Sequence, residues 1–118
     1  MILETAIMTV GADEHEQFQR ALAEAIEFLA QADGFAGISV SRGIEREDAY
    51  LLRISWESLE DHTVGFRESD LFTQWRALIG PYFAEPPVVE HWAPVDGLDR
   101  PLDRPLDRPL DRPAEPAN

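Results

Sequence analysis

The sequence predicts an α+β domain with the element order β-α-β-β-α-β, in which a four-stranded antiparallel sheet carries its helices on one face. One observation on the sequence and one general rule of chain connection predict it. Stretches rich in Ile, Val, Leu and Met, which suit strands, alternate with stretches whose apolar residues recur at helical spacing. Right-handed connections then place the helical segments on the same side of the sheet. The predicted fold is therefore ferredoxin-like.

The first half of the chain is expected to form a strand, a helix and a second strand. Residues 2–10 are rich in Ile, Thr, Val and Met, as strands often are. Asp13, followed three residues later by Glu16, has the pattern of a capping box at the start of a helix. Apolar residues at helical spacing follow, up to a stop at Gly34. A second strand is expected over residues 35–46.

The second half is expected to complete the sheet. A turn leads into a third strand over residues 49–57. Ser58 and Ser69 each precede a short helical segment, and a serine hydroxyl can accept a hydrogen bond from the first free N–H groups of a helix. The last strand is expected over residues 87–92.

The end of the chain has a different composition. Leu-Asp-Arg-Pro occurs four times in succession between residues 98 and 113. Proline at every fourth position removes backbone donors and blocks both helix and sheet. We therefore expect a folded domain over residues 1–94 and a disordered tail over residues 95–118. The tail is read as a tether, a docking peptide or a repeat expansion without a role.

Composition excludes several classes of function. A formal net charge of −13 repels phosphate backbones and anionic membranes, so we expect neither nucleic acid nor a membrane as partner. The chain has no cysteine, which excludes thiolate catalysis and fits a cytoplasmic location, and it has no lysine for Schiff-base chemistry. No apolar run is long enough to span a bilayer, and no signal peptide is expected.

The predicted strands are apolar on both faces. The even-numbered residues of the third strand are all apolar or aromatic, and the first strand has apolar residues of both parities. A sheet with one face in water would show a mostly polar second face. We therefore predict that a second copy of the chain covers the helix-free face. Glu4, Arg53 and Glu90 are expected on that covered face, paired as charges.

The first short helical segment carries the residues best suited to catalysis. Leu59, His62 and Phe66 fall at i, i+3 and i+7, so they are expected to share the face turned toward the sheet. An imidazole there could accept a proton from a phenol or enol, or it could simply be packed in the core. Arg67 could stabilise a phenolate or a developing oxyanion, or pair with a nearby acid in solvent.

Aromatic residues could form a slot for a flat ring, although the same residues would also make an ordinary small core. The candidate substrate-binding residues are Trp56, Phe66, Phe72, Trp75 and Tyr82. The third tryptophan, Trp92, and a second histidine, His91, are expected at the same apolar space. No metal site is predicted, because the three histidines are scattered and no carboxylate sits at ligand spacing. No glycine-rich nucleotide loop occurs either, so no cofactor is expected.

Several segments together resemble the antibiotic biosynthesis monooxygenase family. They are Trp56-Glu-Ser-Leu-Glu-Asp-His62, Phe66-Arg-Glu-Ser69, Phe72 and Pro87-Val-Val-Glu-His-Trp92. The resemblance covers residues 1–93. It implies a homodimer whose sheets meet as a dimeric α+β barrel. It also implies oxygenation of polycyclic phenols or quinols by O2 without metal, flavin or haem. On that basis His62, Arg67, Trp75 and Trp56 would be the participants.

Three functions are left open. The first is a cofactor-independent monooxygenase that oxidises an aromatic quinol- or phenol-type small molecule with O2. The second is a non-catalytic dimeric module for a small hydrophobic ligand, which would need the pocket but no base. The third is a haem-degrading monooxygenase with His62 as the iron ligand. That branch typically has an asparagine on its first strand, where this chain has only Thr5 and Thr9 as neutral polar residues.

Overall fold

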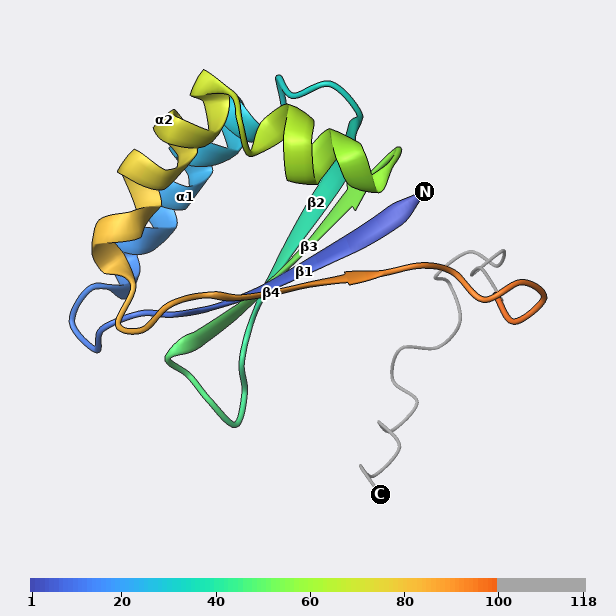
Figure 1. Cartoon of the computed structure of the whole chain (residues 1–118). Helices are drawn as coiled ribbons and strands as arrows, with labels where there is room; N and C mark the ends of the chain where they lie inside the picture. Colours follow the sequence, from blue (N-terminus) through green and yellow to red (C-terminus); the bar gives the residue numbers. More distant parts are fainter. Residues whose placement is uncertain (100–118) are drawn as a thin grey trace, which may run out of the picture.

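The structure, a computed structural model, describes residues 1–99 and confirms the ferredoxin-like fold. The strands are β1 (Ile2–Thr9), β2 (Phe35–Arg42), β3 (Ala49–Trp56) and β4 (Val88–Trp92). The helical segments are α1 (His15–Leu29), the π-helical turn η1 (Asp61–Phe66), α2 (Asp70–Ile79) and the 3-10 turn η2 (Gly80–Tyr82). The strands form one antiparallel sheet in the order β2-β3-β1-β4. All the helical segments lie on one face of it (Figure 1).

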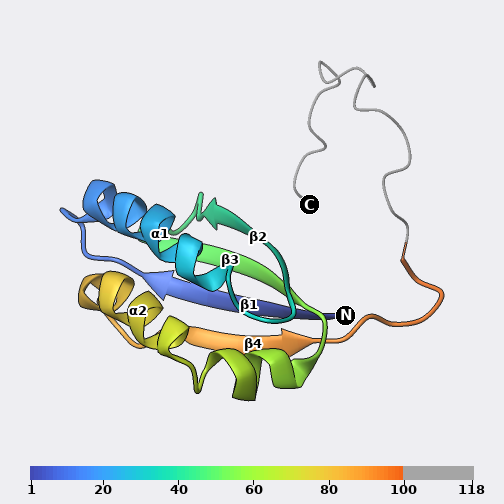
Figure 2. The same cartoon turned by 90° about the horizontal axis from the view of Figure 1, so that it is seen from above.

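The core lies between this sheet and the helices. From above, α1 lies toward β3, and α2 and η1 lie toward β1 and β4 (Figure 2). The even-numbered residues of β3 are all buried, and Leu52 pairs with Ala6 of β1 on the same face. Phe18 and Leu29 of α1 pack onto that face without exposed surface. Burying each such large apolar side chain stabilises the fold by roughly 1.5–3 kcal/mol.

The two serine caps form as expected, whereas the capping box does not. Ser69 Oγ accepts a hydrogen bond from the backbone N–H of Phe72 at 3.4 Å, and Ser58 Oγ accepts one from Asp61 N at 3.1 Å. Helix α1 instead begins after Glu14, without a side-chain cap. The reason is a turn in which Glu14 N donates to Gly11 O at 3.0 Å, which leaves Asp13 outside the helix.

Two element ends also differ from expectation. Helix α1 ends at Leu29, before Gly34, whose φ of +82° serves the turn into β2. Strand β2 ends at Arg42 rather than at residue 46. There the backbone closes into a loop, because Gly43 N donates to Ala49 O at 2.8 Å and Ala49 N donates to Arg46 O at 3.0 Å.

Two of the three charged residues lie on the helix-free face as predicted, and their pairing and cover by a second copy stay predictions. Arg53 and Glu90 flank Thr5 on that face. Glu4 lies on the opposite face, beneath the helices, because its pairing with Ile54 gives it the parity of the core residues. Glu4 is only 5 % exposed. A carboxylate expected at a subunit interface therefore lies inside the protomer.

Trp92 is also on the other side from its expected place. Its indole Nε1 donates to Thr5 Oγ1 at 2.8 Å on the helix-free face, and the residue is 52 % exposed. Trp92 therefore does not join the other two tryptophans. Within residues 1–99, no helix is long and apolar enough to cross a membrane. The predicted tail lies beyond the described residues except for residues 95–99, and the boundary at residue 94 stays a prediction.

Candidate active site

A pocket of about 770 Å³ opens between the helical layer and the β1–β4 side of the sheet. Its volume falls in the range of roughly 300–1,000 Å³ that is typical of small-molecule sites. Five of the seven candidate residues line it: His62, Phe66, Arg67, Phe72 and Trp75. The pocket is also lined by Glu4 from β1 and by the segment 83–87 that leads into β4. The structure thus brings most of the candidate residues together.

The remaining two candidates do not line the pocket. Tyr82 lies against Phe18 of α1, with ring centroids 6.1 Å apart, and faces a separate groove between α1 and η2. Trp56 is fully buried behind the pocket wall, where its ring stacks on His62 at 5.3 Å between centroids. Trp56 can therefore act on a ligand only through the residues in front of it.

The π-helical turn decides which side chains of η1 point inward. Arg67 N donates to His62 O at 3.0 Å, an i+5 bond that marks a wider turn than an α-helix. In this wider turn His62 and Phe66 share the inner face, and each is 3 % exposed. Leu59 is 40 % exposed, so the prediction that it faces the sheet is wrong. The helical spacing assumed for it does not hold through η1.

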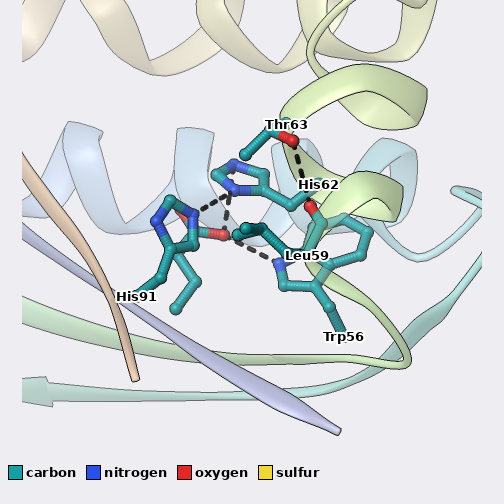
Figure 3. A network of polar contacts seen from close by, with 6 residues as sticks. Trp56, Leu59, His62, Thr63 and His91 are labelled. Carbon is teal, nitrogen blue, oxygen red and sulfur yellow. Dashed lines mark hydrogen bonds and ion pairs between the residues drawn. The ribbon is translucent and has the colours of Figure 1, made fainter. Parts of the chain in front are cut away.

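A chain of polar contacts runs through the back of the pocket (Figure 3). Trp56 Nε1 donates a hydrogen bond to Glu4 Oε1 at 2.8 Å. His62 Nε2 lies 3.3 Å from the same carboxylate oxygen. On the other side of the imidazole ring, His62 Nδ1 lies 2.8 Å from Nε2 of His91, an exposed residue of β4. Both nitrogens of His62 are therefore engaged by protein groups.

Burial shifts the pKa values of this chain toward neutral forms. Burial, followed by the positive fields of His91 and Arg67, lowers the pKa of His62 to about 4. Burial likewise lowers the pKa of His91, with Arg67 adding to the effect. Burial raises the pKa of Glu4, against the opposing effects of the Trp56 hydrogen bond and of Arg67. At neutral pH, His62 is a neutral imidazole that donates at one nitrogen and accepts at the other.

Glu4 is the member of this polar chain that the sequence analysis placed on the wrong face, whereas His91 was expected near His62. One signal for Glu4 was present: it shares its parity with the apolar residues Ala6 and Met8, so it is the one charged residue on the inner face of β1. A carboxylate in that position is costly unless it is hydrogen-bonded. The direct contact between His91 and His62 was not predicted, because the two residues lie 29 positions apart in the sequence.

The histidines and the carboxylate do not form a metal site. Within the described part of the chain, no group of three or more His, Cys, Asp or Glu side chains is arranged to hold a metal ion. His62 Nε2 and Glu4 Oε1 face each other directly, so they do not converge on a common third point. The arrangement is suited to proton transfer between neighbouring groups.

Known proteins resemble this chain in sequence and in fold. The sequence profile of the antibiotic biosynthesis monooxygenase family matches residues 1–78. The uncharacterized protein YczJ of Bacillus subtilis strain 168 is 34% identical over 95 residues, which are 80% of this chain and 100% of that protein.

Solved structures agree with this result. A protein from Bordetella bronchiseptica, assigned to the antibiotic biosynthesis monooxygenases, superimposes with a TM-score of 0.77 at 37% identity and covers 80% of this chain and 96% of its own. A monooxygenase from the gene ActVA-Orf6 of Streptomyces coelicolor was solved with the ligand nanaomycin D. It superimposes with a TM-score of 0.68, and the match covers 85% of this chain and 92% of that protein. At 17% identity, this second likeness shows the fold alone.

Proposed function

This chain belongs to the antibiotic biosynthesis monooxygenase family, and we propose that it oxidises an aromatic quinol- or phenol-type small molecule with O2. The observation that carries the proposal is the pocket beneath the helices. There Phe66, Phe72 and Trp75 offer aromatic walls, and a buried acid–base chain meets the positive charge of Arg67. The reaction that we propose needs no bound cofactor, because the substrate anion itself supplies the electrons.

The residues of the pocket would divide the work as follows. The Glu4–His62 pair takes the proton of the substrate hydroxyl or enol, and the electron pair of the broken O–H bond stays on the substrate. The resulting anion reduces O2. Arg67 stabilises the negative charge that develops on oxygen, and the aromatic walls exclude water from the reacting atoms. For an anthrone, a CH2 group becomes a carbonyl, and the second oxygen atom leaves as water with both hydrogens.

Oxygen uptake with a panel of hydroquinones and anthrones tests this proposal. We expect uptake by the wild type and a loss of about 100-fold in kcat for His62→Ala, because the change breaks the acid–base pair that takes the proton. His15→Ala is the matched control, because His15 contacts Tyr50 and does not line the pocket. No uptake with any substrate, or equal rates in the wild type and His62→Ala, would remove the catalytic proposal.

Ligand-binding measurements on the same pocket distinguish the two alternative functions from catalysis. A binding module without catalysis would quench the fluorescence of Trp75 when an aromatic ligand is added, but it would consume no O2. A haem-degrading enzyme would need His62 as a ligand of iron. The contacts of both ring nitrogens count against that role, since either Glu4 or His91 would have to be displaced. Haem titration without a Soret band at the position of ligated haem would exclude it.

We also propose that the protein is a homodimer joined through the helix-free face of its sheet, since members of the family are typically dimers that bind small molecules. Val88 and Trp92 are each 52 % exposed on that face, where Val88 pairs with Ile7 of β1 and Trp92 pairs with Leu3. A dimer would take this apolar surface out of water. Ile7→Glu should give a monomer in size-exclusion chromatography with light scattering. Ile44→Glu, in the exposed β2–β3 loop, should stay dimeric. A wild type that is monomeric at every concentration would refute the proposal.

A further inference from the structure

We propose that Glu4 is the group that accepts the substrate proton, and that His62 and His91 then carry this proton to solvent. The inference rests on the proposed oxidation and assigns a catalytic role to a residue that the family resemblance did not point to. Three features support it: both nitrogens of His62 are occupied, one oxygen of Glu4 is free, and the chain of contacts ends at the exposed His91.

The first step is that His62 has no free nitrogen to offer a substrate. Its Nε2 lies 3.3 Å from Glu4 Oε1, and its Nδ1 lies 2.8 Å from His91 Nε2. A substrate hydroxyl could reach either nitrogen only by displacing one of these neighbours. The 24° stacking of the ring on Trp56 further restricts its rotation. His62 is therefore placed to relay a proton between two groups, and poorly placed to receive one directly from a ligand.

The second step is that Glu4 does have a free acceptor. Oε1 makes both of its contacts: it accepts a hydrogen bond from Trp56 Nε1 at 2.8 Å and lies 3.3 Å from His62 Nε2. Among residues 1–99, no hydrogen-bond or ion-pair partner is found for Oε2, and Glu4 lines the pocket. No fully buried side-chain oxygen in this part of the chain lacks a partner, so Oε2 retains access to the pocket. A substrate hydroxyl can meet it there.

The third step is the path by which the proton leaves the pocket for solvent. When the substrate O–H bond breaks, its electron pair stays on the substrate oxygen and an O–H bond forms on Glu4. This transfer uses the neutral tautomer of His62 that carries its proton on Nδ1 and leaves Nε2 unprotonated. The carboxyl group of Glu4 gives its proton to Nε2 while the proton of Nδ1 passes to His91 Nε2, and His91 then gives the proton of its own Nδ1 to solvent. His91 is exposed on the edge strand β4 and faces the helical side, away from the proposed dimer face. One proton reaches solvent, and no electron moves along the chain.

The surroundings favour the transfer from the substrate to Glu4 and the loss of the proton from the imidazoles. Burial raises the pKa of Glu4, so its carboxylate binds a proton more readily than an ordinary glutamate does. The positive field of Arg67 acts on both imidazoles and disfavours a lasting positive charge on either. A proton that reaches His62 is therefore passed on and does not stay. Trp56 does not meet the substrate. It is a positioning residue that holds Oε1 through its indole N–H, leaving Oε2 for the pocket.

Kinetics of three variants test the relay with a substrate that the wild type oxidises. We expect Glu4→Gln to lower kcat by about 100-fold while its affinity, measured by quenching of Trp75, changes little, because the amide keeps the shape but not the basicity. His91→Ala should lower kcat by about 10-fold, and added imidazole should restore it. Glu24→Gln, at an exposed site on α1, should match the wild type. A merely structural role would show neither the separation of kcat from affinity nor the rescue by imidazole.

A second measurement needs no turnover. If the protons of the three groups are coupled, Glu4→Gln should change the 15N chemical shifts of the ring nitrogens of both His62 and His91 in histidine-labelled protein. If the wild type oxidises nothing, the proposed function fails on its own, and these spectra still decide whether the relay exists. Unchanged histidine signals in Glu4→Gln would overturn it. So would a Glu4→Gln variant as active as the wild type while His62→Ala is inactive, because His62 would then be the base.

Discussion

Acidification from pH 7 to pH 5 should destabilise the protein through His62. Burial lowers the pKa of this imidazole from 6.5 to about 4 in the folded protein. Between those two values, the unfolded chain binds a proton that the folded protein does not, so the free energy of unfolding falls as the pH falls. The stabilisation is complete above pH 6.5 and is lost as the pH approaches 4.

The size of the effect follows from the same two pKa values. Each pKa unit is worth about 1.4 kcal/mol, so the full interval sets an upper limit of about 3.4 kcal/mol. The step from pH 7 to pH 5 covers about 2 kcal/mol of it. At 3 % exposure, His62 is not screened by solvent. Glu4 acts in the opposite direction, because a raised carboxyl pKa makes the folded protein take up that proton first.

The comparison of the wild type with His62→Gln separates these two contributions. Urea unfolding, followed by tryptophan fluorescence at pH 7 and pH 5, gives the free energy of unfolding of each protein. The wild type should lose about 2 kcal/mol more than His62→Gln does over this interval. His15→Gln should behave as the wild type, because His15 lies outside the chain of polar contacts. Equal losses, or a wild type that gains stability in acid, would mean that His62 is protonated beside Glu4, and the reasoning would be refuted.

Two further predictions concern the backbone that holds the site. Gly34→Ala should cost well over 1 kcal/mol in urea unfolding, because φ is +82° and a Cβ would collide with the side chain of Asp61 at the start of η1. Gly97 has the same φ and open space around it, so Gly97→Ala should cost only the backbone strain of about 1 kcal/mol. If the two substitutions lower the free energy of unfolding equally, the steric argument is refuted. Ser69→Ala should cost about 1 kcal/mol by the same measurement, because α2 loses its cap. Thr73→Ala, at an exposed site of α2, should change stability by less than about 0.5 kcal/mol, and a similar loss there would exclude the cap as the cause.

The element order of the fold could be predicted because it depends on local patterns. The apolar alternation of β3, the helical spacing that begins near Phe18, and the serine cap at Ser69 are each contained within a few residues, and the structure confirms all three. The capping box failed because the competing turn closed by Gly11 uses a backbone hydrogen bond that a side-chain pattern does not reveal. Leu59 failed for a similar reason, since nothing in its spacing indicated a π-helical turn.

The sequence by itself determined the fold class and most of the pocket wall, because apolar periodicity selects which faces are buried, and its motifs indicated the family by resemblance. Only the tertiary structure decided which polar groups meet. Glu4, His62 and His91 come from β1, η1 and β4. The register of β1 between its two neighbours places Glu4 on the inner face, where Glu4 lies 3.3 Å from His62 and His62 lies 2.8 Å from His91. A shift of one residue in that register would turn Glu4 toward the helix-free face. Pairing between distant strands therefore set the chemistry of the site.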